Sequence, residues 1–159
     1  MWYYMIACYG LSLLTFFLIL TAFFQSFLRF PLFHAGHVSV MVLLCILYSF
    51  TETMIIFFFV DIGTRIKELS LEKKIDPGFR QRSIAIKKKV FPPLTMNLLL
   101  MTVLCILSGA VDTRHIPPWA YVLFYLGCVI HFVKTKVVEH RAFRESSDLL
   151  VEISKTHRE

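Results

Sequence analysis

The sequence predicts an all-α integral membrane protein: a bundle of four transmembrane helices with both termini in the cytoplasm. The first observation is composition, because 57% of the 159 residues are hydrophobic and only 18% are charged, more apolar surface than one water-soluble core can bury. The second is the length of the apolar runs, since a helix needs about 20 residues to cross hydrocarbon. The third is the placement of Lys and Arg. Together they predict a single membrane domain, residues 1–159.

The four predicted spans are continuous apolar runs without the alternation of a barrel strand, which indicates helices. They are residues 2–28, 38–60, 94–111 and 119–133. The first contains no charge and is too long for the apolar region of a cleaved signal peptide. The second contains Glu52 as its only charge. Pro92-Pro93 and Pro117-Pro118 precede the two shorter spans, at positions where helix starts tolerate proline.

The connections differ sharply in basic residues. Nine of the 17 Lys and Arg lie in the loop of residues 62–91 and six in the tail of residues 134–159, which leaves only Arg29 and Arg114. Because basic residues stay on the cytoplasmic side, the loop and the C-terminus are predicted inside, and hence the N-terminus too. We expect a multi-pass protein of the plasma membrane, here a bacterial inner membrane.

The basic loop has the pattern of extended helices. The second helix is expected to continue through Leu69, turn at Asp76-Pro77-Gly78 and re-enter through residues 79–90. The net positive charge of this loop favours contact with anionic lipid headgroups. Nucleic acid is not an expected partner, because positive-inside anchoring already accounts for the basic run before Val90. Residues 139–153 of the tail are expected to form a surface or docking helix.

Polar residues at membrane depth fall on one stripe of each of the last three helices. The stripes are His37, Tyr48 and Glu52; Asn97, Cys105, Ser108 and Asp112; and Tyr121, Tyr125 and Cys128, with His131 at the edge. Facing one another, they would form a polar seam. The seam has two interpretations: hydrogen bonding between helices, or a functional path in which Glu52 acts as a proton relay. The four cysteines form no CxxC pair and are expected to be packing residues.

The predicted outer face gathers four residues with metal-binding chemistry: His34, His37, Asp112 and His115. His34 and His37 are three positions apart, and so are Asp112 and His115. The two members of each pair therefore point the same way on a helical turn. They could hold Zn or Cu, or supply an imidazole to a haem iron. The alternative is a set of ordinary interfacial side chains. His131, deep in the last span, is an interhelical hydrogen-bonder, a proton relay or a haem ligand.

From His37 to Lys134, the chain resembles small four-helix membrane haem-binding proteins of the protoporphyrinogen oxidase and copper-resistance D type. The shared features are a His opening a long apolar helix that ends in Val60-Asp61-Ile62-Gly63-Thr64-Arg65, a helix opening Phe91-Pro92-Pro93-Leu94-Thr95, and Ile130-His131-Phe132-Val133-Lys134. The resemblance implies His37 as axial haem ligand and His131 as a second candidate. The hypothesis of a b-type haem subunit pairs His37 with His115 or His131. An extra span precedes His37, and enzymatic activity is not implied.

Three functional hypotheses follow. The first is a haem- or metal-binding subunit, accessory to electron transfer or to a larger membrane complex. The second is a metal or proton transport module in which Glu52 passes the ion inward. The third is a structural assembly subunit whose Phe-rich first two helices face other membrane subunits or a second copy. A free-standing enzyme is not expected, because the chain has no phosphate-binding loop and no GxSxG motif.

Overall fold

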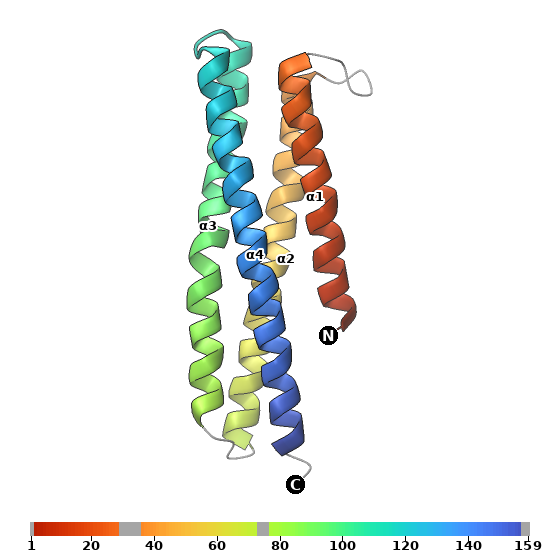
Figure 1. Ribbon diagram of the computed structural model, residues 1–159, viewed down its shortest axis with the longest axis vertical. Coiled ribbons are helices and arrows are strands. Elements are labelled where there is room, and N and C mark those ends of the chain that lie inside the picture. The colour runs from red at the N-terminus through yellow and green to blue at the C-terminus, as the bar shows by residue number, and fades with distance from the viewer. Residues whose placement is uncertain (1, 29–35, 73–76, 157–159) are drawn as a thin grey trace.

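The computed structural model describes residues 2–28, 36–72 and 77–156, which form four long helices (Figure 1). The helices are α1 (Trp2–Leu28), α2 (His37–Glu72), α3 (Pro77–Asp112) and α4 (Pro118–Thr156). Each is long and apolar enough to cross a membrane. The expectation of an all-α, multi-pass architecture is thus confirmed at the level of helices and their composition. Figure 1 also shows that α2, α3 and α4 extend beyond the N-terminal end of α1.

The helices continue well past the predicted spans. α2 reaches Glu72 and α3 begins at Pro77, so the loop expected at residues 62–91 is mostly helix, as its amphipathic pattern indicated. α4 likewise includes nearly all of the tail. The extensions are ordered by packing, because Ile62 and Ile66 on α2 and Leu149 on α4 are buried.

One expected boundary is wrong. Pro92 and Pro93 lie inside α3 rather than at its start. Proline has no backbone N–H, so the carbonyls four residues earlier lose their helical partner, at a cost of about 3 kcal/mol. The helix persists because Val90 and Leu94, on either side, are buried in the bundle. Pro118, by contrast, is the first residue of α4, where its missing N–H costs nothing.

The buried residues of α4 recur at steps of three and four, the spacing of helices that pack side by side at small angles. They are Tyr121, Tyr125, Phe132, Thr135, Glu139, Ala142, Ser146, Leu149 and Ile153, with one step of seven between Tyr125 and Phe132; Phe143, beside Ala142, is buried as well. α3 presents a similar buried stripe from Ser83 to Ser108. In the lower part of the bundle, Phe143 packs against Phe58 and Phe59 of α2, with ring centroids 4.7 and 5.1 Å apart.

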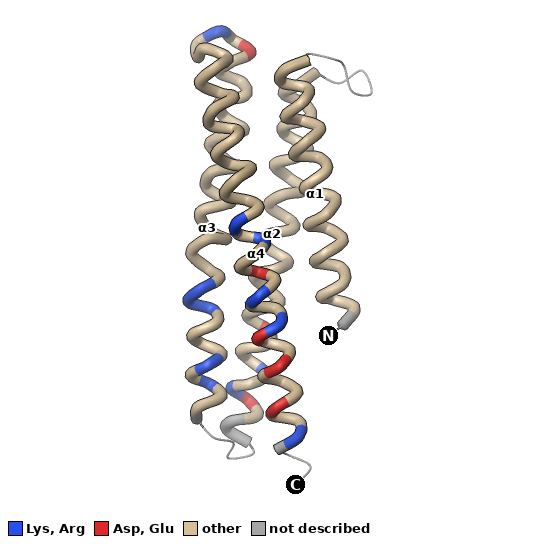
Figure 2. Tube along the Cα trace, viewed as in Figure 1, with Lys and Arg blue, Asp and Glu red and all other residues tan. Residues whose placement is uncertain are grey.

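Charged residues divide the bundle into two halves (Figure 2). We call residues 38–51, 90–111 and 119–133 the uncharged half, because they contain no Lys, Arg, Asp or Glu; residues 52–72, 77–89 and 134–156 form the charged half. On α3 the uncharged stretch is roughly 33 Å long at 1.5 Å per residue. This length matches the hydrocarbon thickness of about 30 Å. At its far end, Asp112 and Arg114 lie at the α3–α4 turn, where Arg114 adopts a positive φ of 62°.

Candidate functional site

The charged side chain buried deepest in the sequence-predicted seam has a partner on another helix. Glu52 of α2 is only 1% exposed, and its Oε1 accepts a hydrogen bond from Lys136 Nζ of α4 at 3.0 Å. The same ammonium donates to both carboxylate oxygens of Glu139, at 3.1 and 2.9 Å. Glu139 is 2% exposed. We call Glu52, Lys136 and Glu139 the ionic cluster.

Local helix geometry explains how one ammonium serves two carboxylates. Lys136 and Glu139 are three positions apart on α4 and therefore lie on one face of the helix. The Lys136 side chain also passes over Phe132, with Nζ 5.0 Å from the ring centroid, which is a cation–π distance. Phe132 and Glu139 both belong to the buried stripe of α4. The position of Lys136 beside this buried stripe therefore directs its ammonium toward α2.

Charge balance within the ionic cluster is uneven. A buried carboxylate costs several kcal/mol unless an opposite charge and hydrogen bonds compensate it. The Lys136 ammonium compensates one of the two carboxylates. With all three groups ionised the cluster has one excess negative charge, so a single bound proton makes it neutral.

A second polar layer lies next to the ionic cluster. His131 Nδ1 and Asn97 Oδ1 form a hydrogen bond between α4 and α3. Thr135 Oγ1 donates to the His131 carbonyl at 3.0 Å and lies 3.5 Å from Nδ1. The side chains of Asn97 and Tyr48 both interact with Glu52. Polar groups from three helices therefore surround one buried carboxylate.

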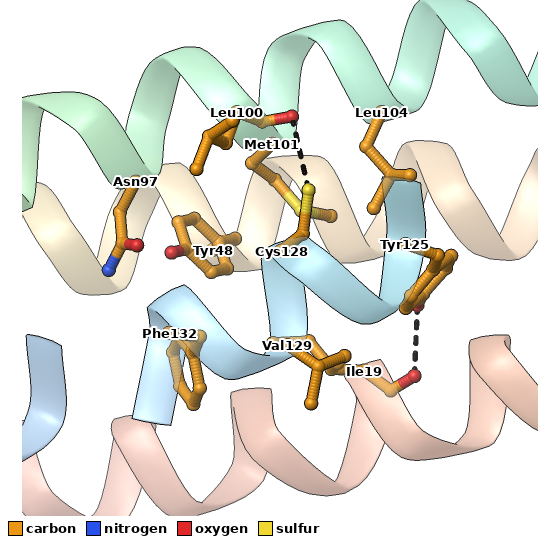
Figure 3. A pocket seen from close by; sticks show the side chains of 10 residues that line it. All are labelled: Ile19, Tyr48, Asn97, Leu100, Met101, Leu104, Tyr125, Cys128, Val129 and Phe132. Atoms are coloured by element: carbon orange, nitrogen blue, oxygen red, sulfur yellow. Dashed lines mark hydrogen bonds between the residues drawn. The ribbon is translucent and has the colours of Figure 1, made fainter. Parts of the chain in front are cut away.

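Unused hydrogen-bonding capacity remains in this layer. Among the described residues, neither Asn97 Nδ2 nor Glu52 Oε2 has a hydrogen-bond partner of good geometry, although both are buried. Figure 3 shows Asn97 and the Tyr48 hydroxyl at one end of a pocket, with Tyr125 at the other end. The pocket volume is about 10 Å³. This is close to the smallest space that holds one water molecule.

The opposite end of the seam has its own polar pair. His37 Nε2 and the Tyr121 hydroxyl are 2.9 Å apart, with the two rings edge to face. His37 Nδ1 is buried and has no hydrogen-bond partner in the described part of the chain. His115 is exposed and bonds Thr113 through Nδ1 at 2.9 Å. Asp112, expected on the inward stripe, is exposed and is the last residue of α3.

The structure describes only some of the residues that were predicted as metal and haem ligands. His34 lies outside the described residues, so the set of His34, His37, Asp112 and His115 stays a prediction. Within residues 2–28, 36–72 and 77–156, no three His, Cys, Asp or Glu side chains gather closely enough to hold a metal ion.

The structure does not place the two proposed axial haem ligands together. His37 contacts Tyr121. His131 lies ten residues after Tyr121 on α4, which corresponds to a rise of about 15 Å between these two residues. The assignment of His37 and His131 as haem ligands therefore stays a prediction.

Sequence reasoning found most of this seam but missed two of the three residues of the ionic cluster. Tyr48, Asn97, Tyr121 and Tyr125 are buried as predicted. The sequence pattern did not place Lys136 in the seam, and it assigned Glu139 to a surface or docking helix of residues 139–153. The steps of three and four that begin at Tyr121 and Tyr125 continue to Glu139, and following them would have placed it inside.

Fold and site together define a class: a four-helix protein with helices able to cross a membrane and an ionic cluster inside the bundle. Comparison with protein-family models, curated proteins and solved structures found no match. Function is therefore inferred from the site.

Proposed function

We propose that this protein is a small proton-transport module of the plasma membrane, with both termini in the cytoplasm and the ionic cluster as its internal proton acceptor. The observation that carries the proposal is the burial of Glu52, bonded to Lys136 and accompanied by Glu139. Ionisable groups at membrane depth are costly, and in membrane proteins they mark ion paths and proton relays.

The depth of Glu52 supports this assignment. It lies fifteen residues from His37, or about 22 Å along α2, which is within the roughly 30 Å of bilayer hydrocarbon. Mutual hydrogen bonding between helices would explain the neutral polar groups alone. It does not explain why two carboxylates share one ammonium, because a purely structural pair needs only one of each.

The polar groups suggest a route. From the outer end, His37 and Tyr121 would pass a proton toward Tyr48 and Asn97, beside which the pocket has room for one water. The proton then forms an O–H bond with Oε2 of Glu52, which has no hydrogen-bond partner of good geometry among the described residues, while Lys136 keeps its bonds to Glu139. Release toward the charged half restores the carboxylate, so the cycle neither consumes nor produces any other species.

The test is proton flux into vesicles that contain the purified protein and a pH-sensitive dye, driven by a potassium diffusion potential. We expect flux above that of protein-free vesicles, and its loss in Glu52→Gln. Asp61→Asn is the matched control, because Asp61 is an exposed carboxylate on the same helix, paired with Arg65. It should conduct like the wild type.

Two results would overturn the proposal. One is wild-type flux no greater than that of protein-free vesicles, which decides the question even if Glu52→Gln fails to fold. The other is a Glu52→Gln variant that keeps its helicity and still conducts fully, since the glutamine cannot accept the proton.

The haem- or metal-binding accessory role implied by the resemblance stays a prediction. A haem would have to lie at the outer end, with His37 or His115 as ligand and a further ligand from another chain, because His37 and His131 do not share one site. Zn or Cu at this end would require His34 in addition to His37, Asp112 and His115.

A further inference from the structure

A groove on the outside of the bundle lies between α1 and α4, and Lys136 is the one member of the ionic cluster that lines it. Its volume is about 440 Å³, within the usual size range of small-ligand sites. Leu13 and Phe16 of α1 and Val133 and Val137 of α4 form apolar walls. The groove is therefore suited to a hydrocarbon chain.

One end of this groove is basic. His140 and Arg141 of α4 line it, four and five residues beyond Lys136, which also contributes to the wall. No acidic residue lines the groove. The Lys136 ammonium is committed to Glu52 and Glu139, whereas Arg141 is exposed and has no ion pair among the described residues. Arg141 therefore supplies the available positive charge.

His140 adds a second polar group at the same end. Its Nδ1 lies 2.8 Å from the Tyr9 hydroxyl of α1, which fixes the ring across the mouth between the two helices. His140 is exposed, so its other ring nitrogen, Nε2, can reach a ligand. The guanidinium of Arg141 offers a planar pair of donors that matches a phosphate.

The level of the groove along the bundle fits a lipid. Phe132 and Val133 belong to the uncharged half, and Arg141 lies about 13 Å further along α4, within the charged half. An apolar slot that rises from a basic mouth into the uncharged half has the polarity of a phospholipid, whose anionic headgroup lies at the membrane boundary and whose chain enters the hydrocarbon. We infer that this groove binds an anionic phospholipid, with its phosphate at Arg141 and His140 and one acyl chain along Phe16 and Val133.

The test uses the detergent-purified full chain and native mass spectrometry, with phosphatidylglycerol and phosphatidylcholine added in parallel. We expect one tightly retained phosphatidylglycerol and weaker retention of phosphatidylcholine. Arg141→Gln should weaken phosphatidylglycerol binding about fivefold, the effect of one basic residue near an anionic surface. Arg144→Gln removes the same charge from the same helix outside the groove and should leave binding unchanged.

Two further measurements test the acyl chain and the phosphate separately. Leu13→Trp fills the apolar wall and should reduce phosphatidylglycerol binding although no charge is altered; circular dichroism checks that the helices are intact. Glycerol phosphate, which has the phosphate but no chain, should not compete. Equal losses in Arg141→Gln and Arg144→Gln, equal binding of the two lipids, or competition by glycerol phosphate would overturn the proposal.

Discussion

Glu52 and Lys136 are 84 positions apart in the chain, yet their side chains meet inside the bundle with Oε1 and Nζ 3.0 Å apart. The pair links α2 to α4 at one register, because sliding either helix by a turn, about 5.4 Å, would leave a buried charge without its partner. A structural requirement and a candidate proton site therefore coincide in the same residues.

Removing the ammonium should destabilise the fold strongly. Lys136→Met leaves two buried carboxylates uncompensated, and we expect the free energy of unfolding to fall by about 3–5 kcal/mol. Adding Glu52→Gln should recover part of this loss, because one of the stranded charges is then gone. Thermal unfolding in detergent, followed by circular dichroism, measures both. Lys134→Met, at an exposed position, is the control; an equal effect there would contradict the prediction.

The Asn97–His131 hydrogen bond should matter less than the ion pairs but still measurably. Asn97→Leu keeps the volume roughly constant and removes the partner of a half-buried imidazole. We expect a loss of about 1–3 kcal/mol, the cost of an unsatisfied buried polar group. Thr102→Val on the same helix is the comparison, since Thr102 is exposed and bonds only its own helix. Indistinguishable unfolding curves would show that the bond contributes nothing.

Orientation can be tested with single cysteines in a variant whose four native cysteines are replaced. Arg114→Cys, at the α3–α4 turn, should react with a membrane-impermeant maleimide in intact cells. Lys155→Cys, near the end of α4, should react only after permeabilisation. This follows from the excess of Lys and Arg in residues 62–91 and 134–159. The opposite labelling pattern would reverse the proposed topology.

An absorption spectrum, recorded before and after dithionite reduction, tests the haem hypothesis directly. Because His37 bonds Tyr121 and His131 bonds Asn97 instead of sharing one site, we expect a flat visible spectrum from the purified protein. A Soret band that is lost in His37→Ala and kept in His140→Ala would contradict this expectation. It would place a haem at the outer end and favour electron transfer over proton transport.

Periodicity made most of the fold predictable. Apolar length gave four helices, and the 100° repeat placed Tyr48, Glu52 and Asn97 on inward stripes, because burial in a helical bundle depends mainly on which face a residue occupies. The start of α3 was misplaced, since Pro92-Pro93 is typical of a helix start, a local preference that the packing of Val90 and Leu94 overrides. The local preference of proline predicts a helix boundary at a position where tertiary contacts keep the helix continuous.

The sequence by itself determined the number of helices, their apolar length and the residues available for a polar seam, because these follow from composition and spacing along each helix. Only the tertiary structure decided which polar groups meet. Lys136 and Glu139 look like residues of a solvated tail until α4 is packed against α2, whereupon Glu52 becomes their partner. Pairing across helices depends on their relative register and rotation, which interhelical packing sets and the spacing within one helix does not contain.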